Sequence, residues 1–223
     1  MQEIVLKNIS KDYRSNEAYK TLRTNIEFSG ADNKVIVLTS CTPDEGKSTV
    51  SLNLSISLAE SGKKVLFIDA DLRKSVLTGR HRVTEEVKGL SHFLSGQAEV
   101  EEVMYKTQEE GLIVMFAGVV PPNPSELLGQ KRFEALISSA RKVYDYIIID
   151  APPLGSVIDA AVIARVCDAS VLVTAANAVS YKFARTVKGQ MEKTGCPILG
   201  VVLNKVNMKN KYYGKYYGNY GEK

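Results

Sequence analysis

Six short apolar runs separated by helical segments most constrain how this chain folds. The runs cover 34–39, 64–69, 112–117, 144–149, 170–175 and 198–203. They are continuously hydrophobic, as in Val65-Leu66-Phe67-Ile68, which indicates strands buried on both faces. Helices are predicted between them over 47–61, 125–142, 156–167 and 180–194. This alternation predicts an α/β fold in three layers, with a mostly parallel central sheet flanked by helices on both faces.

Composition and charge set limits on the function. Hydrophobic residues make up 44% and charged residues 24% of the 223 residues, which excludes a disordered chain and suits one sizeable domain. No apolar run is long enough to cross a bilayer and the three cysteines lie far apart, so we expect a cytoplasmic protein with free thiols. The net charge of +4 equals that of residues 205–223 alone, which hold five lysines and one glutamate. The neutral remainder argues against a nucleic-acid-binding body.

Residues 1–205 are expected to form a single domain that begins with a helical arm over 1–30, its helix running from about Glu17 to Phe28. Residues 206–223 have almost no aliphatic side chains, which predicts a flexible tail. Five of the 11 tyrosines lie there: Tyr212, Tyr213, Tyr216, Tyr217 and Tyr220. Such a tail suits three roles: a low-complexity end, a stacking surface for single-stranded nucleic acid, or a set of accessible phosphate acceptors.

The strongest local motif is segment 40–49, Ser-Cys-Thr-Pro-Asp-Glu-Gly-Lys-Ser-Thr, between a predicted buried strand and a predicted helix. This is the context of a phosphate-binding loop, although Ser40 stands where a glycine is usual. In such a loop Lys47 neutralises the β- and γ-phosphate oxygens, the Ser48 hydroxyl holds Mg²⁺, and Thr49 lies near the α-phosphate. The residues predicted to bind the nucleotide here are Thr42, Asp44, Glu45, Gly46, Lys47, Ser48 and Thr49.

Two further predicted strands end in aspartates, one in Asp69-Ala70-Asp71 and the other in Asp150. Side chains alternate along a strand, so Asp69 and Asp71 point the same way, toward the sheet edge where ligands bind. Strand-end aspartates also serve as caps or turn residues. Three of them beside a phosphate loop nevertheless predict a Mg-nucleotide site. The loop alone suits an ATPase and a kinase equally, and Asp69 could take the proton of a phenol in a kinase.

Three segments give the chain a resemblance to a known family. They are Asp69-Ala70-Asp71-Leu72-Arg73, Pro121-Pro122-Asn123-Pro124-Ser125-Glu126-Leu127-Leu128 and the tyrosine-rich end. Together they resemble the bacterial tyrosine kinases, in particular the separate cytoplasmic kinases of capsular and exopolysaccharide systems. The resemblance implies the deviant Walker form of the P-loop NTPase fold, ATP and Mg²⁺ as cofactors, and autophosphorylation of the tail tyrosines.

The resemblance also implies roles for single residues. Asp69 corresponds to the catalytic base, and Lys47 and Asp71 complete the catalytic set. The implied magnesium ligands are Ser48, Asp71 and Asp150. Asn204 corresponds to a position that often recognises adenine, and a strand-end turn residue is an equal alternative.

The chain departs from the family at two places. The family usually carries a proline shortly after Arg73, but Lys74-Ser75 follow here. A Glu-x-x-Arg-x-x-Arg pattern that serves ring assembly is present as Glu17, Lys20 and Arg23. Lysine keeps the charge of the middle position but loses the bidentate geometry of arginine. The resemblance implies a homo-oligomeric ring of the unphosphorylated protein.

The family also implies partners. They are a membrane adaptor of the polysaccharide co-polymerase type, which recruits and activates the kinase at the inner face of the membrane, and a tyrosine phosphatase, with no nucleic acid. The implied role is control of capsular or exopolysaccharide synthesis and export. Two rival functions are a partition- or division-type ATPase switch, whose signature lysine position is Thr42 here, and a non-catalytic nucleotide-dependent scaffold.

Three other residues have simpler expected roles. Cys41, inside the loop, is either a reactive thiol, since helix N-termini lower a thiol pKa, or a small residue that fills space. His81 and His92 have polar sequence neighbours and are expected on the surface.

Overall fold

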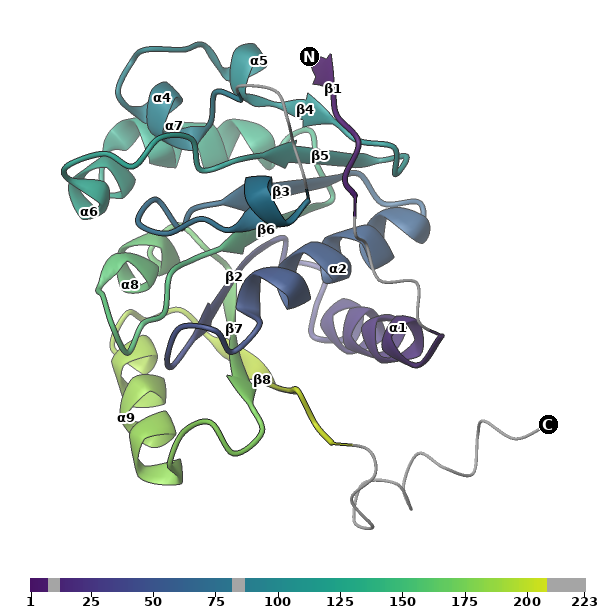
Figure 1. Ribbon diagram of the computed structural model, residues 1–223, viewed down its shortest axis with the longest axis vertical. Helices are drawn as coiled ribbons and strands as arrows, with labels where there is room; N and C mark the ends of the chain where they lie inside the picture. The colour runs from purple at the N-terminus through teal and green to yellow at the C-terminus, as the bar shows by residue number, and fades with distance from the viewer. Residues whose placement is uncertain (8–12, 82–86, 208–223) are drawn as a thin grey trace.

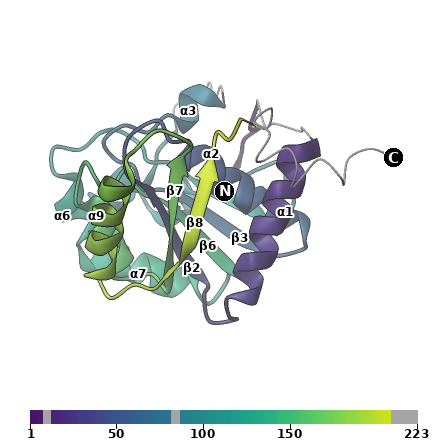
Figure 2. The same cartoon turned by 90° about the horizontal axis from the view of Figure 1, so that it is seen from below.

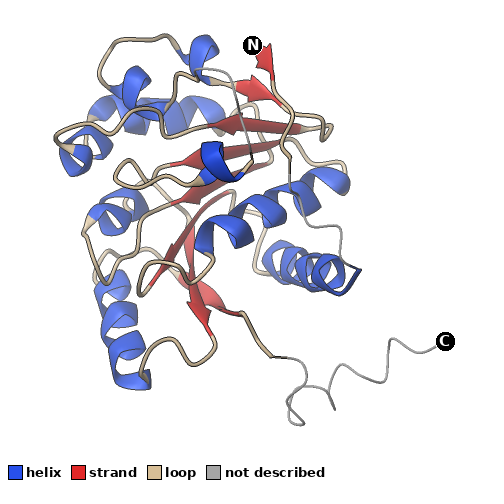
Figure 3. Cartoon of the chain, in the orientation of Figure 1, coloured by secondary structure: helices blue, strands red, loops and turns tan. Residues whose placement is uncertain are grey.

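In the computed structural model, residues 1–7, 13–81 and 87–207 are described, and they form an eight-stranded sheet between two layers of helices (Figures 1 and 3). The strand order is β1-β4-β5-β3-β6-β2-β7-β8, and paired strands are parallel except for β4 and β5. The strands are β1 (Gln2–Glu3), β2 (Val35–Ser40), β3 (Val65–Asp69), β4 (Tyr105–Lys106), β5 (Leu112–Met115), β6 (Tyr146–Asp150), β7 (Ala169–Ala175) and β8 (Ile198–Asn204). The predicted three-layer α/β fold is confirmed.

The central strands are buried on both faces, as their continuous apolar sequences predict. Every residue of β2, β3 and β6 is buried. On one face, Leu38 and Phe67 belong to the same apolar cluster as Val50 and Leu54 of α2 (Lys47–Glu60). Helix α1 (Tyr13–Phe28) packs on the outer side of α2, and Figure 2 shows it across the sheet from α9.

The opposite face carries α6 (Pro124–Leu128), α7 (Lys131–Ala140), α8 (Asp159–Ala164) and α9 (Tyr181–Glu192), together with short α4 (Leu90–Leu94) and α5 (Val100–Val103) (Figure 1). Short α3 (Leu77–Arg80) lies on the α2 side, where Leu77 joins the cluster of Leu38 and Phe67. The single helix predicted over 125–142 is wrong in this respect, because Gly129 ends α6 and Gln130 has extended backbone before α7. The break re-aims the chain, so that Leu128 and Phe133 both pack into the same core.

Two other predictions, the start of the first helix and the position of His81, differ from the structure. Helix α1 begins at Tyr13, four residues before the predicted Glu17. The expected surface position of His81 is wrong, since its side chain is buried and its Nδ1 lies 2.6 Å from the carbonyl oxygen of Lys7. This contact connects Lys7, in the segment after β1, to the end of α3, a long-range pairing that local sequence does not reveal.

Two expectations about the ends of the chain have different outcomes. The tail tyrosines and most of the predicted flexible tail lie outside the described residues, so the tail stays a prediction. Within the described segments, no helix combines the length and apolar character that crossing a membrane requires.

The topology brings the motif-bearing strand ends together. Strand β6 lies between β2 and β3, and Asp150 at its end is the register partner of both Leu38 and Asp69. The loop after β2 and the turn after β3 therefore leave the same sheet edge on either side of Asp150 (Figure 1).

Candidate active site

The loop between β2 and α2 has the backbone of an anion-binding loop. Asp44 and Gly46 adopt positive φ angles of 63° and 86°. Left-handed residues in a loop of this kind form a concave array of backbone N–H groups, to which the start of α2 adds its positive end. At Gly46 only glycine fits, because a Cβ there would lie 2.1 Å from Asn204 Nδ2.

The side chains of one buried residue and two residues at the end of β8 fix the shape of this loop. The carboxylate of Glu45 is 1% exposed and accepts hydrogen bonds from Thr42 N at 2.8 Å and from Thr174 Oγ1 at 2.9 Å. Asn204 Nδ2 donates to the Glu45 carbonyl oxygen at 2.9 Å, and Lys205 Nζ donates to the Asp44 carbonyl oxygen at 2.5 Å. The side chains of Glu45 and Asn204, both predicted to contact nucleotide, thus hold the loop against β7 and β8.

Lys47 joins the loop to the acidic strand ends. Its Nζ lies 2.8 Å from Asp150 Oδ1, 3.3 Å from Ser48 Oγ and 3.9 Å from Asp71 Oδ2. Its side chain is only 7% exposed, so this ammonium contacts carboxylates with little screening by water. An added polyphosphate at the loop would offer Lys47 a stronger anionic partner.

Asp69 ends β3, which lies on one side of β6 and its Asp150, while the loop that carries Lys47 follows β2 on the other side. The side chain is 1% exposed, its Oδ2 accepts a hydrogen bond from Ser75 Oγ at 2.5 Å, and its Oδ1 accepts one from Asp71 N at 3.2 Å. Burial, together with the nearby carboxylate of Asp150, raises the pKa of Asp69 to about 7. A carboxylate with this pKa is suited to accept a proton near neutral pH.

The predicted magnesium ligands fit a divalent cation. Asp150 Oδ2 is buried and has no hydrogen-bond partner among the described residues. Asp150, Asp71 and Ser48 all lie within 3.9 Å of the Lys47 ammonium. No three His, Cys, Asp or Glu side chains of the described chain form a protein-only metal cage. Mg²⁺ usually keeps waters and phosphate oxygens beside one or two carboxylates, so an incomplete protein shell is what a Mg-nucleotide needs.

The turn after Asp71 is clamped to the opposite helices. Arg73 Nε and Nη2 donate to Asp159 at 2.7 and 3.0 Å, and Ser125 Oγ donates to Asp159 Oδ1 at 2.6 Å. Burial raises the pKa of Asp159, but the hydrogen bonds from Arg73 and Ser125 outweigh it and leave the pKa below its ordinary value. The acidic motif and the proline-rich motif singled out from the sequence therefore meet in one ion-pair network.

Comparisons with known proteins agree with this site. A family model described as an AAA domain matches residues 33–187. Tyrosine-protein kinase CpsD of Streptococcus pneumoniae is 45% identical over 223 residues, which cover 99% of this chain and 98% of that protein. The chain belongs to the bacterial tyrosine kinases. The kinase is thus a phosphoryl transferase that acts on protein tyrosine, as predicted.

Solved structures place the kinase within the P-loop NTPase fold. The chimeric protein CapA2B2 superposes with a TM-score of 0.83 at 31% identity, covering 92% of this chain and 94% of that chain. The septum site-determining protein MinD of Pyrococcus horikoshii, solved with Mg-ADP, gives a TM-score of 0.66 at 29% identity, covering 79% of this chain and 72% of that chain. The predicted fold is confirmed, and the kinase binds nucleotide.

The residues predicted to serve ring assembly lie on α1. Glu17 and Lys20 are exposed and pair with each other at 2.7 Å. Arg23 instead donates to the carbonyl oxygen of Ser57 on α2 at 2.6 Å, within the same chain. The predicted ring contacts of these three side chains stay a prediction.

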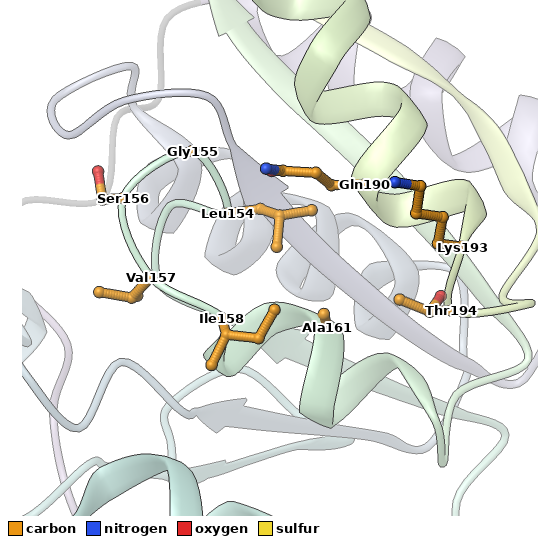
Figure 4. A pocket seen from close by; sticks show the side chains of 9 residues that line it. All are labelled: Leu154, Gly155, Ser156, Val157, Ile158, Ala161, Gln190, Lys193 and Thr194. Carbon is orange, nitrogen blue, oxygen red and sulfur yellow. The ribbon is translucent and has the colours of Figure 1, made fainter.

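A cavity of about 490 Å³ lies away from Lys47, between α8, α9 and the loop after β6 (Figure 4). Its polar lining consists of Ser156, Gln190, Lys193 and Thr194, without a carboxylate. Such a lining offers no ligand set for Mg²⁺. The strand ends, and not this cavity, are therefore the candidate site for a Mg-nucleotide.

Three residues that the sequence did not single out complete the site of the kinase. Ser51 Oγ donates to Asp150 Oδ1 at 3.0 Å, Ser75 holds Asp69, and Thr174 holds Glu45. Ser51 was detectable, because it lies four residues after Lys47 on one helix and so on the same face. Ser75 and Thr174 approach through the tertiary fold, and no spacing pattern marks them.

Cys41 lies in the loop between β2 and α2, and its burial decides between its two expected roles. It is fully buried, and burial together with the Glu45 carboxylate raises the pKa of its thiol to about 11, so it is the space-filling residue and not the reactive thiol. We expect iodoacetamide at pH 8 to leave Cys41 unmodified in the native kinase and to alkylate it in unfolded protein, as peptide mass spectrometry would measure. Alkylation of native Cys41 at the rate of an exposed thiol would contradict this burial.

Proposed function

We propose that this kinase phosphorylates its own tail tyrosines with ATP and that Asp69 is the catalytic base. The observation that carries the proposal is the convergence of Lys47 Nζ, 2.8 Å from Asp150, with Asp69 on the adjoining strand end. Phosphoryl transfer depends on charge neutralisation and positioning, which a buried ammonium and three aspartates on one edge supply.

In the proposed reaction, the γ-phosphoryl group moves from ATP to a tyrosine oxygen. The oxygen of a neutral tyrosine phenol bonds to the γ-phosphorus, the bond from that phosphorus to the bridging oxygen breaks, and ADP leaves. Asp69, with its pKa raised to about 7, accepts the phenolic proton as the new bond forms. Lys47 moves from Asp150 to the β- and γ-phosphate oxygens, and its positive charge offsets the charge that builds up there.

Ser48, Asp71 and Asp150 are proposed to hold Mg²⁺, which when bound neutralises phosphate charge. The unpartnered Asp150 Oδ2 supports this assignment. Asn204 is proposed to recognise adenine with its amide. Its Nδ2 bond to the Glu45 carbonyl places that amide against the loop, next to where a nucleotide on Lys47 would lie.

The tail is the proposed source of acceptors because most tyrosines of the described chain are inaccessible. Burial raises the pKa of the phenols of Tyr19, Tyr144 and Tyr146, and Tyr105 is 2% exposed. A buried phenol cannot enter an active site without local unfolding. The five tail tyrosines have glycine, lysine and asparagine neighbours, a composition that does not form a core.

The test of the acceptors uses labelled ATP and Mg²⁺. We expect stable label on tyrosine in the wild-type kinase and almost none after all five tail tyrosines are changed to phenylalanine. A matched control changes Tyr13 and Tyr181, which are 70% and 82% exposed, to phenylalanine and should keep the label. Released phosphate without protein label would support the ATPase function, and neither product would support a scaffold. Label on serine or threonine would contradict the proposal.

Partners follow from the family. We propose activation by a membrane adaptor of the polysaccharide co-polymerase type, recruitment to the inner membrane face, reversal by a tyrosine phosphatase, and control of capsular or exopolysaccharide synthesis and export. Each phosphotyrosine adds about −1.5 to −2 charges, so five shift the +4 end by roughly −7.5 to −10. Repulsion between such tails supports a ring that forms when unphosphorylated and dissociates when phosphorylated.

A further inference from the structure

Two serine hydroxyls hold the two adjoining buried carboxylates of the active site. Ser51 Oγ donates to Asp150 Oδ1 at 3.0 Å, and Ser75 Oγ donates to Asp69 Oδ2 at 2.5 Å. Asp150 also has the ammonium of Lys47, whereas the other hydrogen bond to Asp69 among the described residues comes from a backbone N–H, that of Asp71. Asp69 thus depends on Ser75 for the side-chain hydrogen bond that fixes its orientation.

We propose that Ser75 is a positioning residue for the base Asp69, which it holds in the orientation that receives the acceptor proton. This inference rests on the proposed function of Asp69. The observation that carries it is the pair of hydrogen bonds that engages both carboxylate oxygens, Oδ2 by Ser75 Oγ and Oδ1 by Asp71 N. A carboxylate held at both oxygens cannot rotate about its terminal torsion without breaking one of them.

The orientation of the Ser75 hydroxyl is itself fixed. Leu77 N donates to Ser75 Oγ at 3.4 Å, so the oxygen receives one proton and directs its own toward Asp69. The backbone around it is held as well, because Asp71 Oδ1 accepts from Lys74 N at 3.1 Å and Arg73 pairs with the fully buried Asp159. The hydrogen bonds of Lys74 N and Leu77 N and the ion pair of Arg73 therefore fix the turn that places Ser75 next to Asp69.

The consequence is specific to the chemical step. Ser75 is half-buried behind the strand end and touches the base, not the loop that binds phosphates. Its loss should leave nucleotide binding intact and let Asp69 rotate away from the acceptor. Among the substitutions of Ser75, alanine removes the hydroxyl that engages Asp69 and threonine keeps it.

The experiment measures autophosphorylation of the full chain at saturating MgATP and, separately, affinity for a fluorescent ATP analogue. For Ser75→Ala we expect the rate to fall about tenfold or more, with affinity changed less than about twofold, since a hydrogen bond to a charged group is lost only where the base acts. Ser75→Thr keeps the hydroxyl and should restore most of the rate. Ser55→Ala removes a buried hydroxyl that bonds only to the Ser51 carbonyl oxygen at 2.8 Å and should keep the wild-type rate.

Asp69→Asn and the double variant Ser75→Ala/Asp69→Asn separate the inference from the proposed function. If Ser75 acts through Asp69, the double variant is no slower than Asp69→Asn alone. A wild-type rate in Ser75→Ala with a slow Asp69→Asn would overturn the role of Ser75 and leave the base in place. A wild-type rate in Asp69→Asn would overturn the base itself. Equal losses of rate and affinity in Ser75→Ala, or no rescue by threonine, would show a merely structural serine.

Discussion

Replacement of Lys47 by methionine is expected to reduce tyrosine phosphorylation by at least about a thousandfold. The ammonium lies among Asp150, Asp71 and Ser48, so its removal takes away the positive charge that the phosphates would meet. Methionine keeps the length and the apolar stem of the side chain, which isolates the loss of charge. The nucleotide-free fold should also lose stability, on the order of 3 kcal/mol, because Asp150 would be left buried without its cation.

Two measurements check these effects of Lys47→Met. Label from ATP incorporated into the protein reports transfer, and urea unfolding reports stability. Lys64→Met, which removes the same charge from an exposed lysine just before β3, is the matched control and should change neither. Transfer by Lys47→Met within about tenfold of the wild type would mean that this lysine does not serve the phosphates.

Asp69→Asn is expected to lower transfer about a hundredfold to a thousandfold and at the same time to stabilise the nucleotide-free protein above pH 7. Activity falls because an amide cannot accept the phenolic proton. Stability rises because the replaced carboxylate is buried beside Asp150, an arrangement that raises its pKa from the ordinary 3.8 to about 7. The carboxylate of Asp69 is therefore expected to increase the rate of transfer and to decrease the stability of the folded protein.

The sign of the pH effect follows from proton uptake. Between pH 3.8 and about 7 the folded state binds a proton at Asp69 that the unfolded state does not bind, so this group makes the folded protein less stable as pH rises through that window. Above about pH 7, Asp69 is ionised in both states, so its destabilising effect on the folded protein no longer changes with pH. The stability advantage of Asp69→Asn over wild type should therefore grow from pH 4 to 7 and level off at about 4 kcal/mol.

Urea unfolding at a series of pH values, with a chelator present, measures this difference. Asp145→Asn is a control, because that aspartate lies outside the buried cluster and accepts a hydrogen bond from Lys64 N near the surface. A difference between wild type and Asp69→Asn that stays constant from pH 4 to 8 would contradict the raised pKa.

The fold and the main site residues were predictable because they depend on local pattern. Continuous apolar runs located the six long strands to within a residue or two of their starts, and parallel topology then placed Asp69 and Asp150 on neighbouring strand ends. The division of 125–142 into two helices was not predictable from periodicity alone. Gly129 serves equally well inside a surface helix at modest cost, and only the core that both halves share decides the break.

The supporting residues were harder to predict, for a physical reason. Glu45 was expected at the nucleotide, yet its carboxylate reaches Thr174, which is 129 residues away in the chain. His81, expected at the surface, is buried against the start of the chain. A polar side chain reads the same in sequence whether its partner is a ligand, water or another segment, and only long-range packing distinguishes them.

The hydrogen bond from Asn204 to the Glu45 carbonyl oxygen links the edge strand β8 to the candidate phosphate-binding loop. A chain shortened ahead of β8 would lose the Asn204 amide, which lies beside Gly46 and bonds to the Glu45 carbonyl oxygen. It would also lose the Lys205 ammonium that bonds to the Asp44 carbonyl oxygen. The candidate phosphate-binding loop would then be unsupported on the β8 side. We therefore expect the shortest fragment that binds nucleotide to extend through Lys205. The tyrosine-bearing segment follows directly after this residue in the sequence.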